Sequence, residues 1–181
     1  MPLLISKDLQ AKMSKNDKNT EVDKKMIFHF DSMPPSDNSL YLNMPGRGRV
    51  LAPKTRTYKQ EIEEAVLEQI KHQDRTTDPK SIKYTDQILD LTDKELIVAL
   101  IFCSSWYTKS DTIRKKDCQN YSKAILDSIW NAFKTINPLL DDSQIWSFSI
   151  NKIEVQENGG NEYTEVIIKS IEDNIEDEIG E

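Results

Sequence analysis

The stretch KELIVALIFCSSW, residues 94–106, decides the fold of this 181-residue chain. After Glu95 it is apolar without interruption as far as Cys103. A run of this length predicts a strand at the centre of a sheet, covered on both faces. It is much shorter than the roughly 20 apolar residues that cross a bilayer, so we expect no membrane partner.

Alternating apolar residues predict further strands on both sides of this segment. They lie at residues 26–30, 143–155 and 162–172. The turn sequence ENGGN at 157–161 predicts that the last two strands form a hairpin. Within 143–155 the alternation shifts phase between Ile150 and Ile153, which predicts a β-bulge there.

Helical spacing of apolar residues predicts two amphipathic helices, over 57–73 and 119–136. Asn137-Pro138 ends the second. The element order therefore predicts one α/β (α+β) domain, a mixed sheet with two main helices, over residues 26–172. We expect a flexible extension at 1–25 and an acidic tail at 173–181.

The net charge of −7 is concentrated at one end of the chain. Residues 162–181 hold eight acids and one base, so residues 1–161 are neutral with 23 of each. The total charge therefore does not exclude a DNA partner. Only two cysteines occur, and the N-terminus lacks the apolar stretch of a signal peptide, so we expect a cytoplasmic protein.

Two clusters of basic residues are candidates for phosphate contact. The first lies among glycines and prolines that allow close backbone approach, and the second directly precedes a polar motif. An ordinary solvated loop is the alternative for the first cluster. The candidate DNA-binding residues are Arg47, Arg49, Lys54, Arg56 and Lys59, then Arg114, Lys115 and Lys116.

The polar motif has two parts, KKDCQNYSKAILD at 115–127 and LLDDSQIW at 139–146. At about 100° per residue, Asn120, Lys123 and Asp127 lie within roughly 60° of one another on a helix. If the strands before and after this helix are neighbours, Asp117 and the Asp141-Asp142 pair could meet at one sheet edge. Carboxylates beside lysines suit Mg²⁺-assisted cutting of a phosphodiester.

Structural alternatives exist for each part of the motif. Asp117 alone is a good helix N-cap, and Lys123 with Asp127 is a common surface pair at i,i+4 spacing. Asp141-Asp142 alone could be a turn before a strand. No phosphate-binding glycine loop, dinucleotide-binding turn or paired CxxC occurs, so we expect no nucleotide cofactor and no zinc site.

The two motif parts together resemble the RusA family of Holliday-junction resolvases, endodeoxyribonucleases of phages and prophages. The family pattern is Asp-x-Asp-Asn-x-x-Lys-x-x-x-Asp-x-[Leu/Ile], followed by Asp-Asp-x-x-[Ile/Val] opening a strand. This chain has DCQNYSKAILDSI and DDSQI in that order, preceded by PPSDNSLY, which is similar to the family's Pro-Pro-Ser-x-Asn opening. The resemblance covers roughly residues 26–172.

The resemblance implies a role for each motif residue. Asp117 and Asp142 would be metal ligands. Together with Lys123, the catalytic cation, they would be the catalytic residues. Asp141 would be a supporting acid near the metal, and Asn120 and Asp127 would support the site. The resemblance also implies Mg²⁺ or Mn²⁺ as cofactor, a four-way DNA junction as substrate and a homodimer that cuts symmetrically.

One position departs from the pattern. Gln119 stands where the family has its second Asp and offers a neutral carbonyl oxygen in place of a carboxylate. Asp141, Asp111 or Glu154 could supply the missing charge. The alternative function is therefore a cleavage-deficient relative that binds branched DNA or a protein partner.

Overall fold

A computed structural model of the protein describes residues 24–78, 81–108, 110, 112–114, 117–155 and 160–171. The expected acidic tail and nearly all of the expected N-terminal extension lie outside these residues, as do Lys115, Lys116 and Asp111. No described helix has the length and apolar composition needed to span a bilayer.

A four-stranded mixed sheet forms the centre of the molecule, in the order β1-β6-β4-β5. Its strands are β1 (Met26–Phe30), β4 (Leu96–Ser104), β5 (Ile145–Glu154) and β6 (Tyr163–Ser170). β4 runs parallel to β5 and antiparallel to β6, which in turn runs antiparallel to β1. The predicted fold class, mixed sheet and central position of the apolar segment are therefore confirmed.

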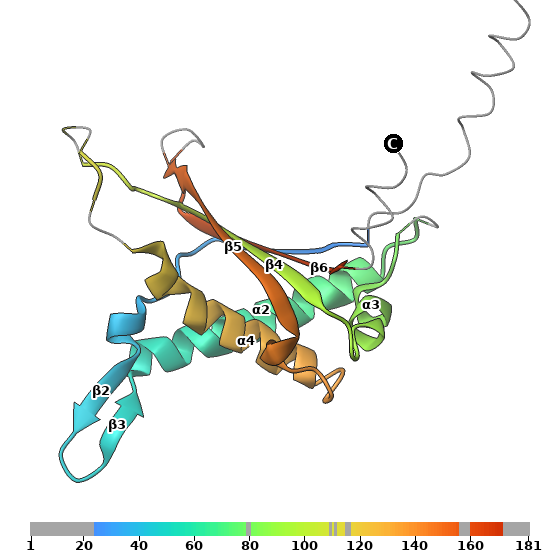
Figure 1. Ribbon diagram of the computed structural model, residues 1–181, viewed down its shortest axis with the longest axis horizontal. Helices are drawn as coiled ribbons and strands as arrows, with labels where there is room; N and C mark the ends of the chain where they lie inside the picture. The colour runs from blue at the N-terminus through green and yellow to red at the C-terminus, as the bar shows by residue number, and fades with distance from the viewer. Residues whose placement is uncertain are drawn as a thin grey trace, which may run out of the picture.

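Helices cover one face of this sheet (Figure 1). They are α2 (Pro53–Asp74), the short α3 (Tyr84–Asp90) and α4 (Ser122–Lys134), and η2 (Cys118–Tyr121) leads into α4. Along β4 the side chains of Leu96, Val98, Leu100 and Phe102 are buried against the helices, whereas those between them are half-buried. The prediction that β4 is covered on both faces is thus wrong, because both long helices pack on the same side.

Two further predictions about the strands are wrong. β6 does not pair with β5 as a hairpin; it lies on the other side of β4. Because β4 is the most apolar strand, flanking it on both sides buries more apolar surface than a β5–β6 pair at the edge. The register irregularity lies opposite Leu96 and Ile97, where Trp146 is the extra residue, and not between Ile150 and Ile153.

Helix α2 begins earlier than expected. Pro53 occupies its first turn, where a missing N–H costs nothing, so residues 53–56 belong to the helix rather than to the preceding loop. Before it, β2 (Tyr41–Met44) and β3 (Gly48–Leu51) form an antiparallel hairpin. The hairpin projects away from the sheet (Figure 1). Gly46 and Gly48, both at φ 71°, allow its tight turn.

The two edges of the sheet differ in protection. On β1, the Gln69 side chain accepts from His29 N at 3.0 Å and donates to His29 O at 2.9 Å. The Tyr84 hydroxyl makes the same pair of contacts with the backbone of Ile27, at 3.0 and 3.3 Å. At the other edge, β5 exposes 69% of Trp146 and 43% of Phe148. Side chains therefore cap the β1 edge, and β5 is the edge suited to pairing.

A buried amide fixes the connection from α4 to β5. Asn137, only 4% exposed, donates to Ile88 O at 3.1 Å and to Thr92 Oγ1 at 2.9 Å. Its own oxygen accepts from Leu139 N at 3.2 Å. Asn137 thereby ties the segment before Asp141 to α3 and its following turn.

We predict that Asn137→Ala lowers the free energy of unfolding by about 1–3 kcal/mol, because it removes the buried hydrogen bonds of Asn137 to Ile88 O and Thr92 Oγ1 and the bond from Leu139 N. Urea unfolding followed by circular dichroism measures the change. Leu139→Ala, at a residue 74% exposed, is the matched control and should change stability by less than about 0.5 kcal/mol. An Asn137→Ala effect as small as the control's would contradict this role.

Candidate functional site

The first part of the motif caps η2. Asp117 is the N-cap residue, and its Oδ1 accepts a hydrogen bond from Gln119 N at 3.0 Å. Gln119 is exposed, and its carbonyl accepts from Ser122 Oγ at 2.8 Å at the start of α4. Asn120 donates its backbone N–H to Asp117 O at 3.2 Å. Asp117 therefore acts as the cap that its sequence position predicts. Its Oδ2 atom does not take part in this hydrogen bond.

Asp127 joins two lysines from different helices. Its Oδ2 lies 3.1 Å from Lys59 Nζ on α2, and its Oδ1 lies 3.4 Å from Lys123 Nζ on α4. The Lys59 side chain is 19% exposed, against 54% for Lys123. Asp127 therefore restrains both ammonium groups, and Lys123 is the one of the two that faces solvent.

Asp37 approaches this group from η1 (Asp37–Ser39), the short helix that follows the two prolines. The pKa of the Asp37 carboxyl is raised above its usual range, chiefly by burial. The positive charge of Lys123 opposes this effect, and the negative charge of Asp127 adds to it. The backbone amide of Lys123 contributes a further hydrogen bond that lowers this pKa. An acid next to the first turn of α4 is favourable because the helix N-terminus is electropositive.

The Asp-Asp corner, residues 141–142, is held by a capping box around η3 (Asp142–Gln144). Ser143 N donates to Asp141 Oδ1 at 3.0 Å, and Asp141 N donates to Gln144 Oε1 at 2.9 Å. The bond from Ser143 N holds the pKa of the Asp141 carboxyl below its usual range. Gln144 Nε2 also donates to Leu91 O at 2.9 Å, which anchors the corner to the chain ahead of β4.

Lys123 and Asp127 of the first motif part and Asp142 of the second line one cavity of about 340 Å³. Four of its charged lining residues are Lys59, Lys123, Asp127 and Asp142. Its remaining walls are Leu126, Trp130, Asn131, Lys134 and Ile145. The arrangement can offer ammonium groups to an anion while carboxylates hold those groups in place.

The structure does not bring Asp117 to Asp142 within one chain. Asp142 lies three residues before Ile145, which pairs with Leu96 at the start of β4. Asp117 leads into η2, where the Tyr121 ring lies 6.3 Å from the Phe102 ring near the end of β4. Six strand residues, roughly 20 Å, separate Leu96 from Phe102.

The expectation that the helix start and the Asp-Asp corner meet at one sheet edge is therefore wrong for a single chain. The reason is that α4 runs antiparallel to both parallel strands, so its beginning and its end lie at opposite ends of the sheet (Figure 1). In the part of the chain that is described, no three His, Cys, Asp or Glu side chains lie close enough to hold a metal ion.

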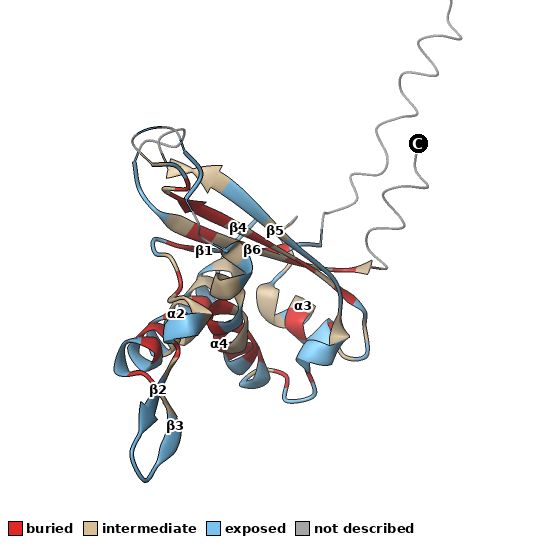
Figure 2. Cartoon of the chain, turned by 60° about the vertical axis from the view of Figure 1, so that its left-hand side comes forward, coloured by how far each residue is buried: buried red, intermediate tan, exposed pale blue. Residues whose placement is uncertain are grey.

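The basic residues of the first cluster divide between two elements. Arg47 and Arg49 lie on the β2–β3 hairpin, and Lys54 and Arg56 lie in the first turn of α2, all four exposed. Arg49 stacks over the Tyr41 ring with its Cζ 4.3 Å from the ring centroid. The outer part of the hairpin is exposed, whereas Tyr41, Val50 and Leu51 at its base are half-buried (Figure 2). Arg114 is exposed on the loop that follows β4.

Sequence reasoning missed three residues at this site. Lys134 lines the cavity, and its Nζ lies 3.9 Å from Asp141 Oδ2. Extending the helical spacing of Lys123 and Asp127 by seven residues would have found it. Asn131, which donates to Glu63 Oε1 at 2.8 Å, lies on the same stripe. Asp37 had no such signal, because its proximity to Lys123 depends on the tertiary fold.

We predict that Lys59 is coupled to Asp127 more strongly than Lys123 is, because its ion pair is shorter and less exposed. Double-mutant cycles with Lys59→Met, Lys123→Met and Asp127→Asn measure both couplings in urea unfolding. We expect about 1 kcal/mol for the Lys59 pair and about 0.3–0.5 kcal/mol for the Lys123 pair, after allowing for solvent screening. Equal couplings would show that Lys59 is not held by this contact.

A comparison with protein families gives a match. The family model described as Endodeoxyribonuclease RusA matches residues 31–169, which is more than half of the chain. The matched region contains the hairpin, both long helices, β4, β5 and all of β6 except Ser170, whereas β1 lies just before it. No curated protein matches the chain.

Proposed function

This chain belongs to the RusA family of Holliday-junction-resolving endodeoxyribonucleases, and from that premise we propose that it makes paired, symmetric nicks in branched double-stranded DNA. Mg²⁺ is the proposed cofactor, with Mn²⁺ as the alternative. The observation that carries the proposal is the shared cavity of Lys59, Lys123, Asp127 and Asp142, residues that lie on three separate elements.

Lys123 is the proposed catalytic cation. It is the more exposed of the two lysines on Asp127, and the Asp127 carboxylate limits the positions of its ammonium group. A positive charge held in place before the reaction can stabilise negative charge that develops on a scissile phosphate. Removing such a donor typically costs about 10²–10³ in rate.

Asp117 and Asp142 are the proposed metal ligands, and we propose that they come from two different copies of the chain. Within one copy the two carboxylates lie at opposite ends of the sheet, so neither copy alone holds the ion. When bound, the ion would neutralise phosphate charge and lower the pKa of an attacking water. The chain's own contribution is to present oxygen ligands, which Mg²⁺ prefers.

Antiparallel pairing of β5 with β5 of a second copy supplies a geometry for this site. A two-fold axis near the middle of β5 would bring Ile145 of one copy beside Glu154 of the other. The Asp-Asp corner precedes Ile145, and η2 contacts β5 in the same chain, so Asp142 of one copy would approach Asp117 of the other. The exposed Trp146 and Phe148 on β5 support this choice of edge.

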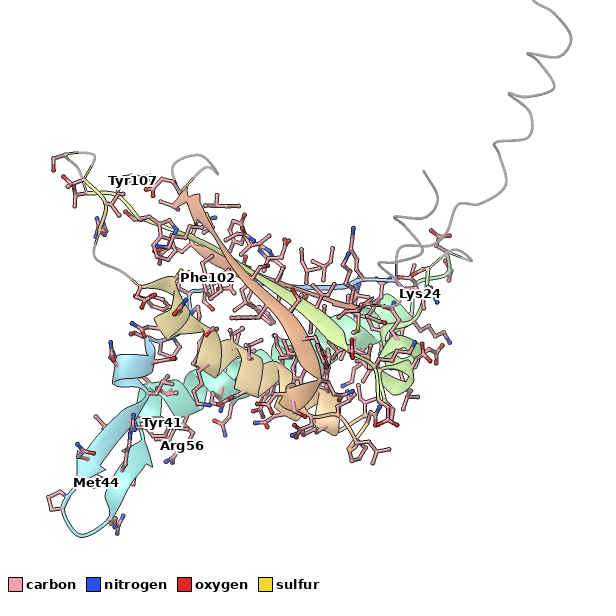
Figure 3. All side chains as sticks on the ribbon, viewed as in Figure 1. Lys24, Tyr41, Met44, Arg56, Phe102 and Tyr107 are labelled. Carbon is pink, nitrogen blue, oxygen red and sulfur yellow. The ribbon has the colours of Figure 1, made fainter. Side chains whose placement is uncertain are left out.

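The exposed cations are the proposed DNA-facing groups. Arg47 and Arg49 belong to the β2–β3 hairpin. Met44 on the same hairpin lies beyond the body of the domain (Figure 3). Phosphate contacts of this kind position a duplex without reading its sequence. Lys59 is the exception in the first cluster, because its ammonium group is paired with Asp127.

A cleavage-deficient protein that binds junctions is the second candidate function, and Gln119 favours it. Gln119 is exposed next to Asp117, at the position where the family pattern has a carboxylate. Glu154 does not replace that charge freely, because its Oε2 accepts from Trp106 N at 2.7 Å. Asp141 lies at the Asp142 end and is engaged by Ser143.

A synthetic four-way junction with Mg²⁺ or Mn²⁺ separates the two candidates. For the nuclease we predict paired nicks that Asp142→Asn abolishes, because a metal ligand is lost while junction binding persists. Nicks are measured on end-labelled strands, and binding by gel shift at low salt. For the binder we predict tight binding without nicks, with cutting appearing in Gln119→Asp. Absence of both binding and cutting would reject both candidates.

Mixing two inactive variants tests whether the metal site is shared between copies. We predict that Asp117→Asn and Asp142→Asn are each inactive alone and that their heterodimer regains one intact site, which makes single nicks instead of paired ones. If wild type does not cut, the same experiment is done in the Gln119→Asp background.

The matched controls for this mixing experiment address the β5 edge. Trp146→Glu in both chains should abolish the nicking activity that the mixture regains. It should also shift the mass in solution to that of a monomer, as measured by light scattering. Leu89→Glu, at an exposed leucine on α3, should leave both unchanged. A site complete within one chain predicts no recovery from any mixture.

A further inference from the structure

A second cavity lies at the end of the sheet near Asp117. It has a volume of about 260 Å³ and is lined by Trp106, Tyr107, Ile113, Arg114, Lys152 and Glu154. None of these residues belongs to the cavity of Lys123 and Asp142. Tyr107 projects beyond Phe102, at the opposite end of the molecule from Lys24 (Figure 3).

The floor of this cavity is fixed by hydrogen bonds. Trp106 is 4% exposed, and its Nε1 donates to Ile153 O at 3.0 Å and to Phe102 O at 3.2 Å. Lys152 Nζ lies 4.7 Å from the centroid of the Trp106 ring. The indole therefore forms a rigid base, with an ammonium group beside it.

The walls come from a short arm, residues 106–114, whose described residues form an irregular hairpin. Tyr107 and Ile113 form an antiparallel bridge, and Arg114 N donates to Trp106 O at 2.8 Å. Arg114 Nε also donates to Tyr107 O at 2.8 Å. These contacts hold the arm together although Tyr107 is 45% and Ile113 is 69% exposed.

The chemistry of this lining matches one kind of group. An exposed aromatic ring beside two cations is the combination that binds single-stranded nucleic acid, by stacking on a base and pairing with its phosphates. The only carboxylate in the lining, Glu154, is engaged by the Trp106 amide. The volume is below the about 300–1,000 Å³ of sites for drug-sized ligands, so it suits one planar ring.

We propose that this cavity binds a single unstacked nucleobase at the branch point of the junction. Tyr107 stacks on the base, Ile113 shields it from water, and Arg114 and Lys152 contact the flanking phosphates. This inference rests on the proposed junction-binding function and adds a means of preferring branched DNA to duplex DNA. A base in an intact duplex cannot enter the cavity, whereas base pairs at a branch point open at lower cost.

Junctions with an abasic nucleotide at each branch position in turn provide the test. On an intact junction we expect Tyr107→Ala to weaken binding about 5- to 150-fold, the range for loss of one stacked base, and Tyr107→Phe to retain wild-type affinity. When the base that enters the cavity is missing, wild type and Tyr107→Ala should bind equally. Equilibrium gel shifts without divalent metal measure all of these affinities.

The controls separate this inference from the function on which it rests. Leu89→Ala, at an exposed leucine on α3, should not change affinity for any junction. If wild type prefers junctions to duplex and Tyr107→Ala binds the intact junction as tightly as wild type, the base-binding cavity is rejected. The proposed junction-binding function is then unaffected. A Tyr107→Ala loss that persists at every abasic position also overturns the base-binding cavity. Wild type with no preference for junctions overturns both.

Discussion

The packing of α4 against the buried face of the four-stranded sheet is the constraint on which the rest of this molecule depends. Ile125, Ile129 and Phe133 are fully buried there. The centroid of the Phe133 ring lies 5.6 Å from that of Phe28 and 5.7 Å from that of Trp130. Burying three side chains of this size is worth several kcal/mol, since each contributes about 1.5–3 kcal/mol. The polar stripe of α4 is thereby turned toward α2 and the start of β5.

This packing also explains why the polar stripe can exist on an apolar helix. Asp127 lies one turn from buried residues and would be costly without partners, but Lys59 reaches it from α2. The same contact ties the two long helices together on the side where the cavity opens. A structural ion pair and a candidate catalytic group therefore share one carboxylate, which separates the roles of Lys59 and Lys123.

The sequence was sufficient to predict those features that depend on local spacing. The central strand, both long helices, the Asp117 cap and the shared face of Lys123 and Asp127 all follow from periodicity or capping chemistry. The order of strands did not follow, because the position of β6 beside β4 depends on which pairing buries most apolar surface. The separation of Asp117 from Asp142 was missed for a related reason: it depends on the direction of α4 across the sheet. Lys115, Lys116 and Asp111 lie outside the described residues, so their predicted roles stay predictions.

The unequal edges of the sheet limit how this protein can assemble. Gln69 and Tyr84 form hydrogen bonds with backbone groups of β1 that a further strand would need, and neither side chain bonds to β5. Among the described residues, β5 is therefore the edge better suited to strand addition. In the proposed dimer through β5, both outer edges of the combined sheet would be β1, and growth into a fibre would stop there. The side chains that cap the β1 edge would thus limit any assembly formed by strand pairing to two chains.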